Sequence, residues 1–145
     1  MREYANAKIN LCLDVVKKRT DGYHEMNMIM VPLSLCDTLD IVPSDQDRYE
    51  CDHADCTMDE NNTIVRALTL MRDHFGIKDH FHISLNKQIP MEAGLAGGSA
   101  DGAALMRALW KMYELPISLK KLALLGKKIG ADVPFCIRNT GAQVI

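Results

Sequence analysis

A glycine-rich segment in the second half of the chain is the strongest chemical feature of the sequence. It consists of Pro90-Met91-Glu92-Ala93-Gly94-Leu95-Ala96-Gly97-Gly98-Ser99-Ala100 and stands between a predicted strand and a predicted helix. Small residues let the backbone approach phosphate oxygens, and the N–H groups and dipole of the helix that follows favour negative charge. Ser99 adds a hydroxyl for a phosphate or for a nucleotide-bound magnesium ion. We therefore expect a phosphate-binding loop, although a flexible connector or tight helix packing uses the same glycines.

This segment differs from the two best-known nucleotide-binding loops. It lacks the Gly-Lys-Ser/Thr ending of a Walker A loop, and its glycines do not follow the GxGxxG spacing of dinucleotide sites. The class of nucleotide therefore has to be inferred from the other motifs.

Asp132 is the candidate catalytic base. The motif Gly130-Ala131-Asp132-Val133-Pro134 places a single acid among small and apolar residues, between a predicted helix and a predicted strand. A carboxylate in this setting can accept the proton of an attacking alcohol, which is the role that a kinase needs. A turn or capping aspartate has the same local sequence.

Lys8 and Asn10 are candidate ligand-binding residues on a strand. In residues 5–15 the odd positions are apolar and the even positions are mostly polar, so the two side chains project from the same face. They suit a substrate hydroxyl or phosphate, and they equally suit the solvated face of an amphipathic strand.

The motif Asp21-Gly22-Tyr23-His24 joins a turn signal to an aromatic ring and an imidazole. Tyr23 can stack on a nucleobase, and His24 can hydrogen-bond to its edge. A hairpin turn with a surface aromatic residue has the same composition, so both interpretations stay open at this point.

The periodicity of the chain predicts a single α+β domain that positions these motifs. We expect strands over 5–15, 24–35 and 37–42, the last broken by Pro43, and then a polar loop over 44–61 with a short edge strand. The rest is predicted as a helix from the Asn61/Asn62 cap to Phe75, a strand over 81–85, a helix over 100–112, a helix over 118–129, and strands over 133–137 and from 142.

Composition excludes several function classes. The 145 residues are 48% hydrophobic and 25% charged, with a formal net charge of −2, so no basic surface for nucleic acid is expected. No apolar run has the length that a membrane span requires. Five irregularly spaced cysteines do not form a secreted disulfide framework, which favours a cytoplasmic location. The segment Cys51-Asp52-His53-Ala54-Asp55-Cys56 has no second Cys/His pair at zinc spacing, so we expect no metal ligands there.

Taken in order, the motifs resemble the family of 4-diphosphocytidyl-2-C-methyl-D-erythritol kinases within the GHMP kinase superfamily. The resemblance covers essentially the whole chain and rests on Ala7-Lys8-Ile9-Asn10-Leu11, Asp21-Gly22-Tyr23-His24, Asn61-Asn62, the glycine-rich segment and Gly130-Ala131-Asp132-Val133-Pro134. The glycine-rich segment alone indicates the superfamily, and the combination indicates the family. The implied fold is the GHMP kinase N-terminal domain, which is similar to ribosomal protein S5 domain 2.

The resemblance implies ATP-dependent phosphorylation of the C2 hydroxyl of 4-diphosphocytidyl-2-C-methyl-D-erythritol, in the non-mevalonate isoprenoid pathway. By this resemblance Asp132 is the catalytic base, and Lys8 pairs with it and stabilises charge near the transferred phosphoryl group. Asn10 would position the substrate.

The remaining implied roles concern binding. Tyr23 and His24 would hold the cytosine of the substrate, Asn62 would lie near the adenine, and residues 90–100 would cradle the phosphates of ATP with its Mg²⁺. The expected partner is a small-molecule substrate, with neither nucleic acid nor membrane as a partner.

The sequence departs from the family in two places. Gly98-Ser99 stands where the superfamily often has a serine pair, so one hydroxyl is missing. Such kinases also have a C-terminal domain with a third glycine-rich motif, which this chain lacks. We therefore expect residues 1–145 to be the ATP- and substrate-binding N-terminal domain, and the strand-like ending at 142–145 suggests that the natural polypeptide continues.

Three alternatives remain at this stage. Another GHMP kinase would act on homoserine, mevalonate or a sugar, and competition by CDP distinguishes it. A non-catalytic S5-like module would bind RNA or a protein, which a gel shift tests for RNA. Alternatively, this half folds and binds ATP weakly without turnover.

Overall fold

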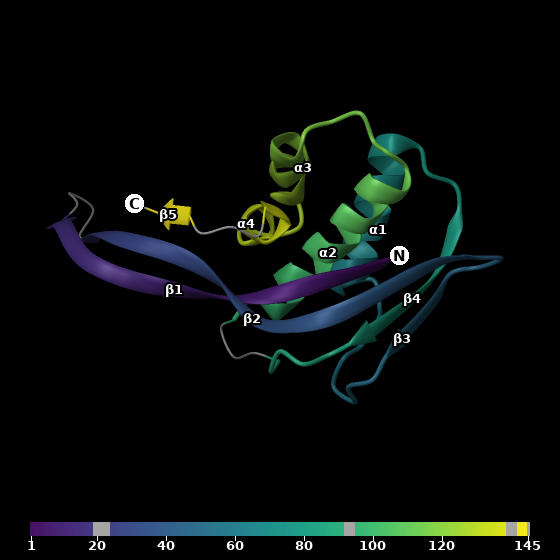
Figure 1. The fold of residues 1–145 in the computed structure, drawn as a ribbon, viewed down its shortest axis with the longest axis horizontal. Helices are drawn as coiled ribbons and strands as arrows, with labels where there is room; N and C mark the ends of the chain where they lie inside the picture. The colour runs from purple at the N-terminus through teal and green to yellow at the C-terminus, as the bar shows by residue number, and fades with distance from the viewer. Residues whose placement is uncertain (19–23, 92–94, 139–141, 145) are drawn as a thin grey trace.

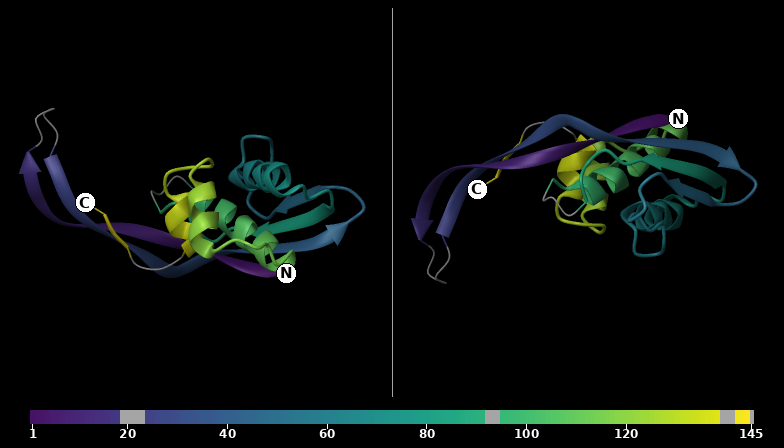
Figure 2. Two further views of the ribbon diagram at one scale, coloured as in Figure 1. Left: turned by 90° about the horizontal axis from the view of Figure 1, so that it is seen from above. Right: turned by 90° about the horizontal axis from the view of Figure 1, so that it is seen from below.

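A mixed sheet and four helices form two layers in the computed structural model, which describes residues 1–18, 24–91, 95–138 and 142–144, with only the backbone for 12–18, 24–28 and 142–144. The helices lie on one face of the sheet (Figures 1 and 2). In chain order the elements are β1 (Arg2–Lys18), β2 (His24–Ser44), β3 (Arg48–Cys51), α1 (Thr63–Phe75), β4 (His80–Asn86), α2 (Gly97–Met112), α3 (Leu119–Gly126), α4 (Val133–Arg138) and β5 (Ala142–Val144). The α+β class predicted from the sequence is confirmed.

The sheet has the strand order β1-β2-β4-β3, and β5 pairs with β2. β1 and β2 are antiparallel, as are β2 and β4, whereas β3 runs parallel to β4 at the edge. The far ends of β1 and β2 continue beyond the helices as a long two-stranded arm (Figure 1). The short edge strand expected within residues 44–61 is present as β3.

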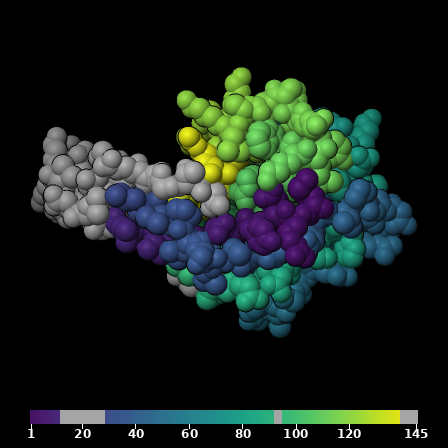
Figure 3. All heavy atoms as spheres, viewed as in Figure 1, coloured from purple at the N-terminus to yellow at the C-terminus, as the bar shows by residue number. Residues whose placement is uncertain are grey.

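Helix α2 is the central element of the core. Its small residues are buried, and they allow close contact with the sheet and with α1: Ala100, Gly102, Ala103, Ala104 and Ala108. A Cβ at Gly102 would lie 3.3 Å from both the Cβ and the carbonyl oxygen of Thr63, so the two helices meet at nearly backbone distance. The space-filling view shows the start of β1 beside α2 on one face of the molecule (Figure 3).

Helix caps agree with the sequence predictions. The Asn62 side chain accepts a hydrogen bond from the Ile64 N–H at the start of α1, and Gly76 ends this helix in the left-handed conformation with φ 68°. Ser118 caps α3 through the Lys121 N–H, but this helix ends at Gly126 rather than at residue 129.

The prediction that Pro43 ends a separate short strand is wrong. β2 is continuous from His24 to Ser44, and Pro43 pairs with Phe81 of β4. The Ile41 N–H donates to the Met1 carbonyl oxygen, on the side of β2 that pairs with β1. The nitrogen of Pro43, two residues further along, faces the same side, just beyond the first residue of β1. A proline there removes no hydrogen bond from the sheet.

The prediction of a strand over residues 133–137 is also wrong, because this segment is helix α4. Val133, Phe135 and Ile137 alternate as in a strand, but the structure buries Val133, Cys136 and Ile137 at helical spacing. Pro134 is tolerated because it lies in the first turn, where its missing N–H would have no partner within the helix. No helix in the described ranges is long and apolar enough to cross a membrane.

Asp47, in the turn between β2 and β3, bonds to both α1 and β4. Both of its carboxylate oxygens accept from the Arg72 guanidinium at 2.7 Å, and one also accepts from the Phe81 N–H at 3.1 Å. The hydrogen bonds from Arg72, against the opposing effect of burial, lower the pKa of Asp47 to about 2. The ionised carboxylate therefore ties α1 to β4.

We expect Asp47→Asn to lower the free energy of unfolding at pH 7 by about 2 kcal/mol, a usual contribution of hydrogen bonds to charged groups. Because the folded-state pKa is depressed, this contribution is complete above the unfolded value near 3.8 and is lost as the pH falls towards about 2. The difference in the free energy of unfolding between the variant and the unmodified protein should therefore become smaller as the pH falls. Urea denaturation at pH 7, 4 and 3 measures it. Asp45→Asn, at an exposed side chain, is the control. If the difference in free energy of unfolding between Asp47→Asn and the unmodified protein did not depend on pH, this account would be contradicted.

Candidate functional site

The described part of the glycine-rich loop is attached to β1. The Lys8 N–H donates to the Leu95 carbonyl oxygen at 3.0 Å, in a stretch where the pairing of β1 with β2 shifts register between Asn6 and Lys8. Ala96 then adopts the left-handed conformation with φ 58°, and α2 starts at Gly97 without a side-chain cap. An uncapped helix start preceded by small residues is suited to binding an anion.

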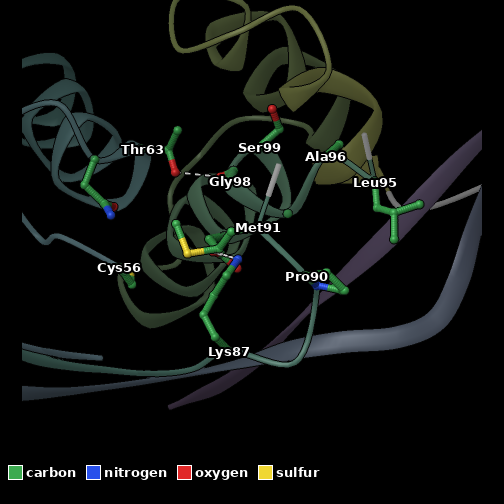
Figure 4. A pocket seen from close by; sticks show the side chains of 12 residues that line it. Cys56, Thr63, Lys87, Pro90, Met91, Leu95, Ala96, Gly98 and Ser99 are labelled. Carbon is green, nitrogen blue, oxygen red and sulfur yellow. Dashed lines mark hydrogen bonds and ion pairs between the residues drawn. The ribbon is translucent and has the colours of Figure 1, made fainter. Parts of the chain in front are cut away.

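A cavity of about 410 Å³ lies between this loop and the start of α1. Figure 4 shows Thr63 and Ser99 on one side of it and Lys87 on the opposite side. The Thr63 hydroxyl donates to the Gly98 carbonyl oxygen at 2.6 Å, which fixes the loop to α1 (Figure 4). The lining residues are Cys56, Asn62, Thr63, Lys87, Pro90, Met91, Leu95, Ala96, Gly97, Gly98, Ser99 and Asp101.

Asp132 lies in the turn immediately before α4, and its carboxylate faces Lys8. The Lys8 Nζ and the Asp132 Oδ2 are 3.8 Å apart, and the lysine side chain is only 6% exposed whereas the aspartate side chain is 42% exposed. The neighbouring Gly130 approaches the loop, since a Cβ built on it would lie 3.8 Å from the Ser99 hydroxyl oxygen. The structure thus brings Lys8, Asp132 and the glycine-rich loop to one place.

The structure gives less support to the predicted roles of three other site residues, Asn10, Asn62 and Ala100. Asn10 is exposed on β1, two residues beyond Lys8. Asn62 lines the cavity, but its side chain is engaged with the Ile64 N–H and, at 3.0 Å, with the Thr57 carbonyl oxygen. Ala100 is buried in the core and does not line the cavity.

Some predicted site residues lie outside the described residues. Tyr23 and the loop residues Glu92, Ala93 and Gly94 belong to this group. His24 is the first residue of β2, and its side chain also lies outside the description. Their predicted roles stay predictions.

A buried charge cluster beneath the loop was missed by the sequence analysis. The Lys87 ammonium lies 2.7 Å from Asp37 Oδ2 and 3.0 Å from Asp101 Oδ2, and all three side chains are at most 5% exposed. Asp37 also accepts from the N–H groups of Gln88 and Ile89 at 2.6 and 2.8 Å. The cluster therefore fixes the segment that leads from β4 into the loop.

The two carboxyl groups of this cluster differ in protonation. Burial, and then the hydrogen bond with Asp37, raises the pKa of Asp101 to about 9, against the effect of Lys87. Burial also opposes ionisation of Asp37, but hydrogen bonds from Asp101, Ile89, Lys87 and Gln88 keep its pKa below the usual range. Asp101 Oδ1 has no hydrogen-bond partner in the part of the chain that is described, and burying such an oxygen costs less in a neutral carboxyl than in an ionised one.

Comparisons with known proteins show which proteins this chain is similar to. The family description "GHMP kinases N terminal domain" matches residues 62–140. The chain is 44% identical over 135 residues to 4-diphosphocytidyl-2-C-methyl-D-erythritol kinase of Exiguobacterium sibiricum, covering 92% of this chain and 47% of that protein. It is 46% identical over 143 residues to the putative enzyme of the same name from Staphylococcus aureus, covering 97% of this chain and 50% of that protein. The chain thus spans about half the length of the curated relatives it matches.

Solved structures show the same similarity. A crystal structure of 4-(cytidine 5'-diphospho)-2C-methyl-D-erythritol kinase matches with a TM-score of 0.80 and 35% identity, over 99% of this chain and 51% of that one. The mevalonate kinase of Methanococcus jannaschii matches with a TM-score of 0.78, over 99% of this chain and 53% of that one. At 16% identity, the second match shows the fold alone.

The buried cluster predicts opposite outcomes for two matched substitutions. Asp37→Asn leaves Lys87 without an ionised partner and should lower the free energy of unfolding at pH 7 by about 3 kcal/mol or more. Asp101→Asn replaces a group that is already neutral at pH 7, so the free energy of unfolding should stay within about 1 kcal/mol of the unmodified protein or rise.

The pH dependence gives a second readout for Asp101→Asn. The folded protein holds this proton up to about pH 9 whereas the unfolded chain releases it near 3.8, so this group makes unfolding easier as the pH rises between those values. The variant should therefore lose less stability over that range in denaturant titrations. Equal losses from the two substitutions would contradict a protonated Asp101.

Proposed function

The chain belongs to the GHMP kinase family through its N-terminal domain, and from this premise we propose that the protein transfers the γ-phosphate of ATP to the C2 hydroxyl of 4-diphosphocytidyl-2-C-methyl-D-erythritol. The observation that carries the proposal is the meeting of Lys8 and Asp132 beside the glycine-rich loop. A base, a cation and a phosphate-binding loop are the parts that phosphoryl transfer to an alcohol requires.

The cavity between the loop and α1 is the proposed binding site for ATP. The uncapped start of α2 offers N–H groups to the phosphates, and Asn62 lines the wall proposed to lie near the adenine. No three His, Cys, Asp or Glu side chains in the described ranges are placed to hold a metal ion. Mg²⁺ usually keeps water ligands and binds through substrate phosphates, and we propose that it would do so here, with the Ser99 hydroxyl beside the phosphates. Bound Mg²⁺-ATP supplies the phosphoryl group and neutralises part of its charge.

Asp132 is proposed as the group that accepts the proton of the substrate hydroxyl. Its side chain is 42% exposed and can be reached by an alcohol, whereas Lys8 is buried. A buried cation stabilises negative charge better than an exposed one, because less water screens it. Lys8 is therefore placed to stabilise the negative charge that develops during the transfer.

The proposed substrate follows from the relatives rather than from the described geometry. Relatives at 40–46% identity and a solved structure at 35% identity carry the name of this kinase. The roles proposed for Tyr23 and His24 at the cytosine, and for Asn10 along β1, extend that similarity to this chain. A cytoplasmic location, with a small molecule as the partner, belongs to the same proposal.

Asp132→Asn tests the base. We expect kcat to fall by about 10² to 10⁴-fold, the usual contribution of a positioned base, with the affinity for ATP unchanged. The measurement is steady-state turnover, with nucleotide binding measured separately, in the longest natural polypeptide that contains this chain. Asp55→Asn in an exposed turn is the control, and a variant that keeps full turnover would overturn the assignment.

Lys8→Ala tests the cation. Because its charge acts mainly on the transition state, kcat should fall by about 10² to 10³-fold while KM changes little. Lys120→Ala, at an exposed position of α3, serves as the control. A change confined to KM would show that Lys8 only binds the substrate.

A further inference from the structure

Lys8 and Asp132 belong to separate elements, so their separation depends on how β1 and α4 are held together. Lys8 is part of β1, and Asp132 precedes the six-residue helix α4. The 3.8 Å between Lys8 Nζ and Asp132 Oδ2 is longer than an ordinary hydrogen bond, so direct bonding between the two groups does not set it.

Arg107 of α2 bonds to both elements. Its Nη1 donates to the carbonyl oxygens of Cys136 at 2.6 Å and Ile137 at 3.3 Å, in α4. Its Nη2 donates to the Tyr4 carbonyl oxygen of β1 at 2.7 Å. The guanidinium thus joins the backbones of β1 and α4.

The charge of Arg107 is balanced within the same buried region. Its Nε lies 3.4 Å from Glu3 Oε2, and the Lys111 ammonium lies 2.5 Å from Glu3 Oε1. Arg107 is 8% exposed and Glu3 is 6% exposed. The rigid, planar guanidinium offers several donors at fixed angles, which a lysine does not. On the surface of the molecule, the start of β1 lies beside α2 (Figure 3).

A continuous chain of contacts connects the two catalytic residues through this side chain. The Asp132 carbonyl oxygen accepts from the Cys136 N–H at 3.1 Å, and the Cys136 carbonyl oxygen accepts from Arg107. Arg107 in turn bonds to Tyr4, four residues before Lys8 along β1. A shift of α4 relative to β1 would therefore move Asp132 relative to Lys8.

We propose that Arg107 is a positioning residue that sets the separation of Lys8 and Asp132 by clamping α4 to β1. This inference rests on the proposed function, in which that pair takes the proton and stabilises charge. Displacing a reacting group by about 1 Å can cost on the order of 10²-fold in rate, so the clamp acts on kcat.

The test uses Arg107→Met and Arg107→Lys in the longest natural polypeptide that contains this chain. The lysine variant keeps the positive charge but loses the planar guanidinium, so it remains informative if the methionine variant does not fold. We expect kcat to fall by roughly 10- to 100-fold in either variant, with the dissociation constant for ATP changed by less than about two-fold.

A double-mutant cycle with Lys8→Ala separates positioning from general loss of structure. If Arg107 acts through the pair, adding its substitution to Lys8→Ala should lower kcat by less than about three-fold further. If the double variant instead lost kcat by the product of the two separate effects, the proposal would be overturned. Arg66→Met is the matched control, because this exposed arginine also bonds to a backbone carbonyl, that of Lys128, outside α4.

Amide hydrogen exchange tests the clamp without any turnover. Exchange across Val133–Arg138 should accelerate in the Arg107 variants and stay unchanged in β4, His80–Asn86. Unchanged exchange in α4 would refute the clamp itself. Absence of turnover in the unmodified protein would instead refute the proposed function, and the exchange result would still decide whether the clamp exists.

Discussion

Helix α2 can lie directly on the sheet and on α1 because the face it buries includes Gly102 and four alanines, and the whole site depends on this contact. Gly102 meets Thr63 at nearly backbone distance, and Thr63 in turn bonds to Gly98 in the loop. The start of the helix faces the cavity, and its body carries both Asp101 and Arg107. Larger residues on this face would separate the helices and displace every group that the helix positions.

Two buried charge clusters then fix the orientation of α2. Asp37, Lys87 and Asp101 tie its first turn to β2 and to the end of β4, and Glu3 with Arg107 ties its middle to β1 and α4. Buried charges are costly unless they are paired, and they contribute definite geometry rather than much stability. At this site they connect the phosphate-binding loop, Lys8 and Asp132, which come from three distant parts of the chain.

The sequence predicted what depends on local pattern. The strand that carries Lys8, the capped helix after Asn62 and the glycine-rich loop were all expected, because alternation, capping and small residues are local signals. The short helix α4 was missed, because an alternating apolar pattern fits a six-residue strand equally well. The buried clusters were missed because only the fold brings Asp37, Lys87 and Asp101 together. A lysine directly before the loop and an aspartate within a run of small residues were the available signals.

Release of ADP from Mg²⁺-ATP tests the central claim most directly, namely that this domain positions a base and a cation for phosphoryl transfer to a cytidyl substrate. The assay would use the longest natural polypeptide that contains this chain, with 4-diphosphocytidyl-2-C-methyl-D-erythritol, mevalonate and homoserine as separate acceptors. The account predicts rapid release with the cytidyl substrate alone. Release with mevalonate or homoserine instead, or none with any acceptor, would contradict it.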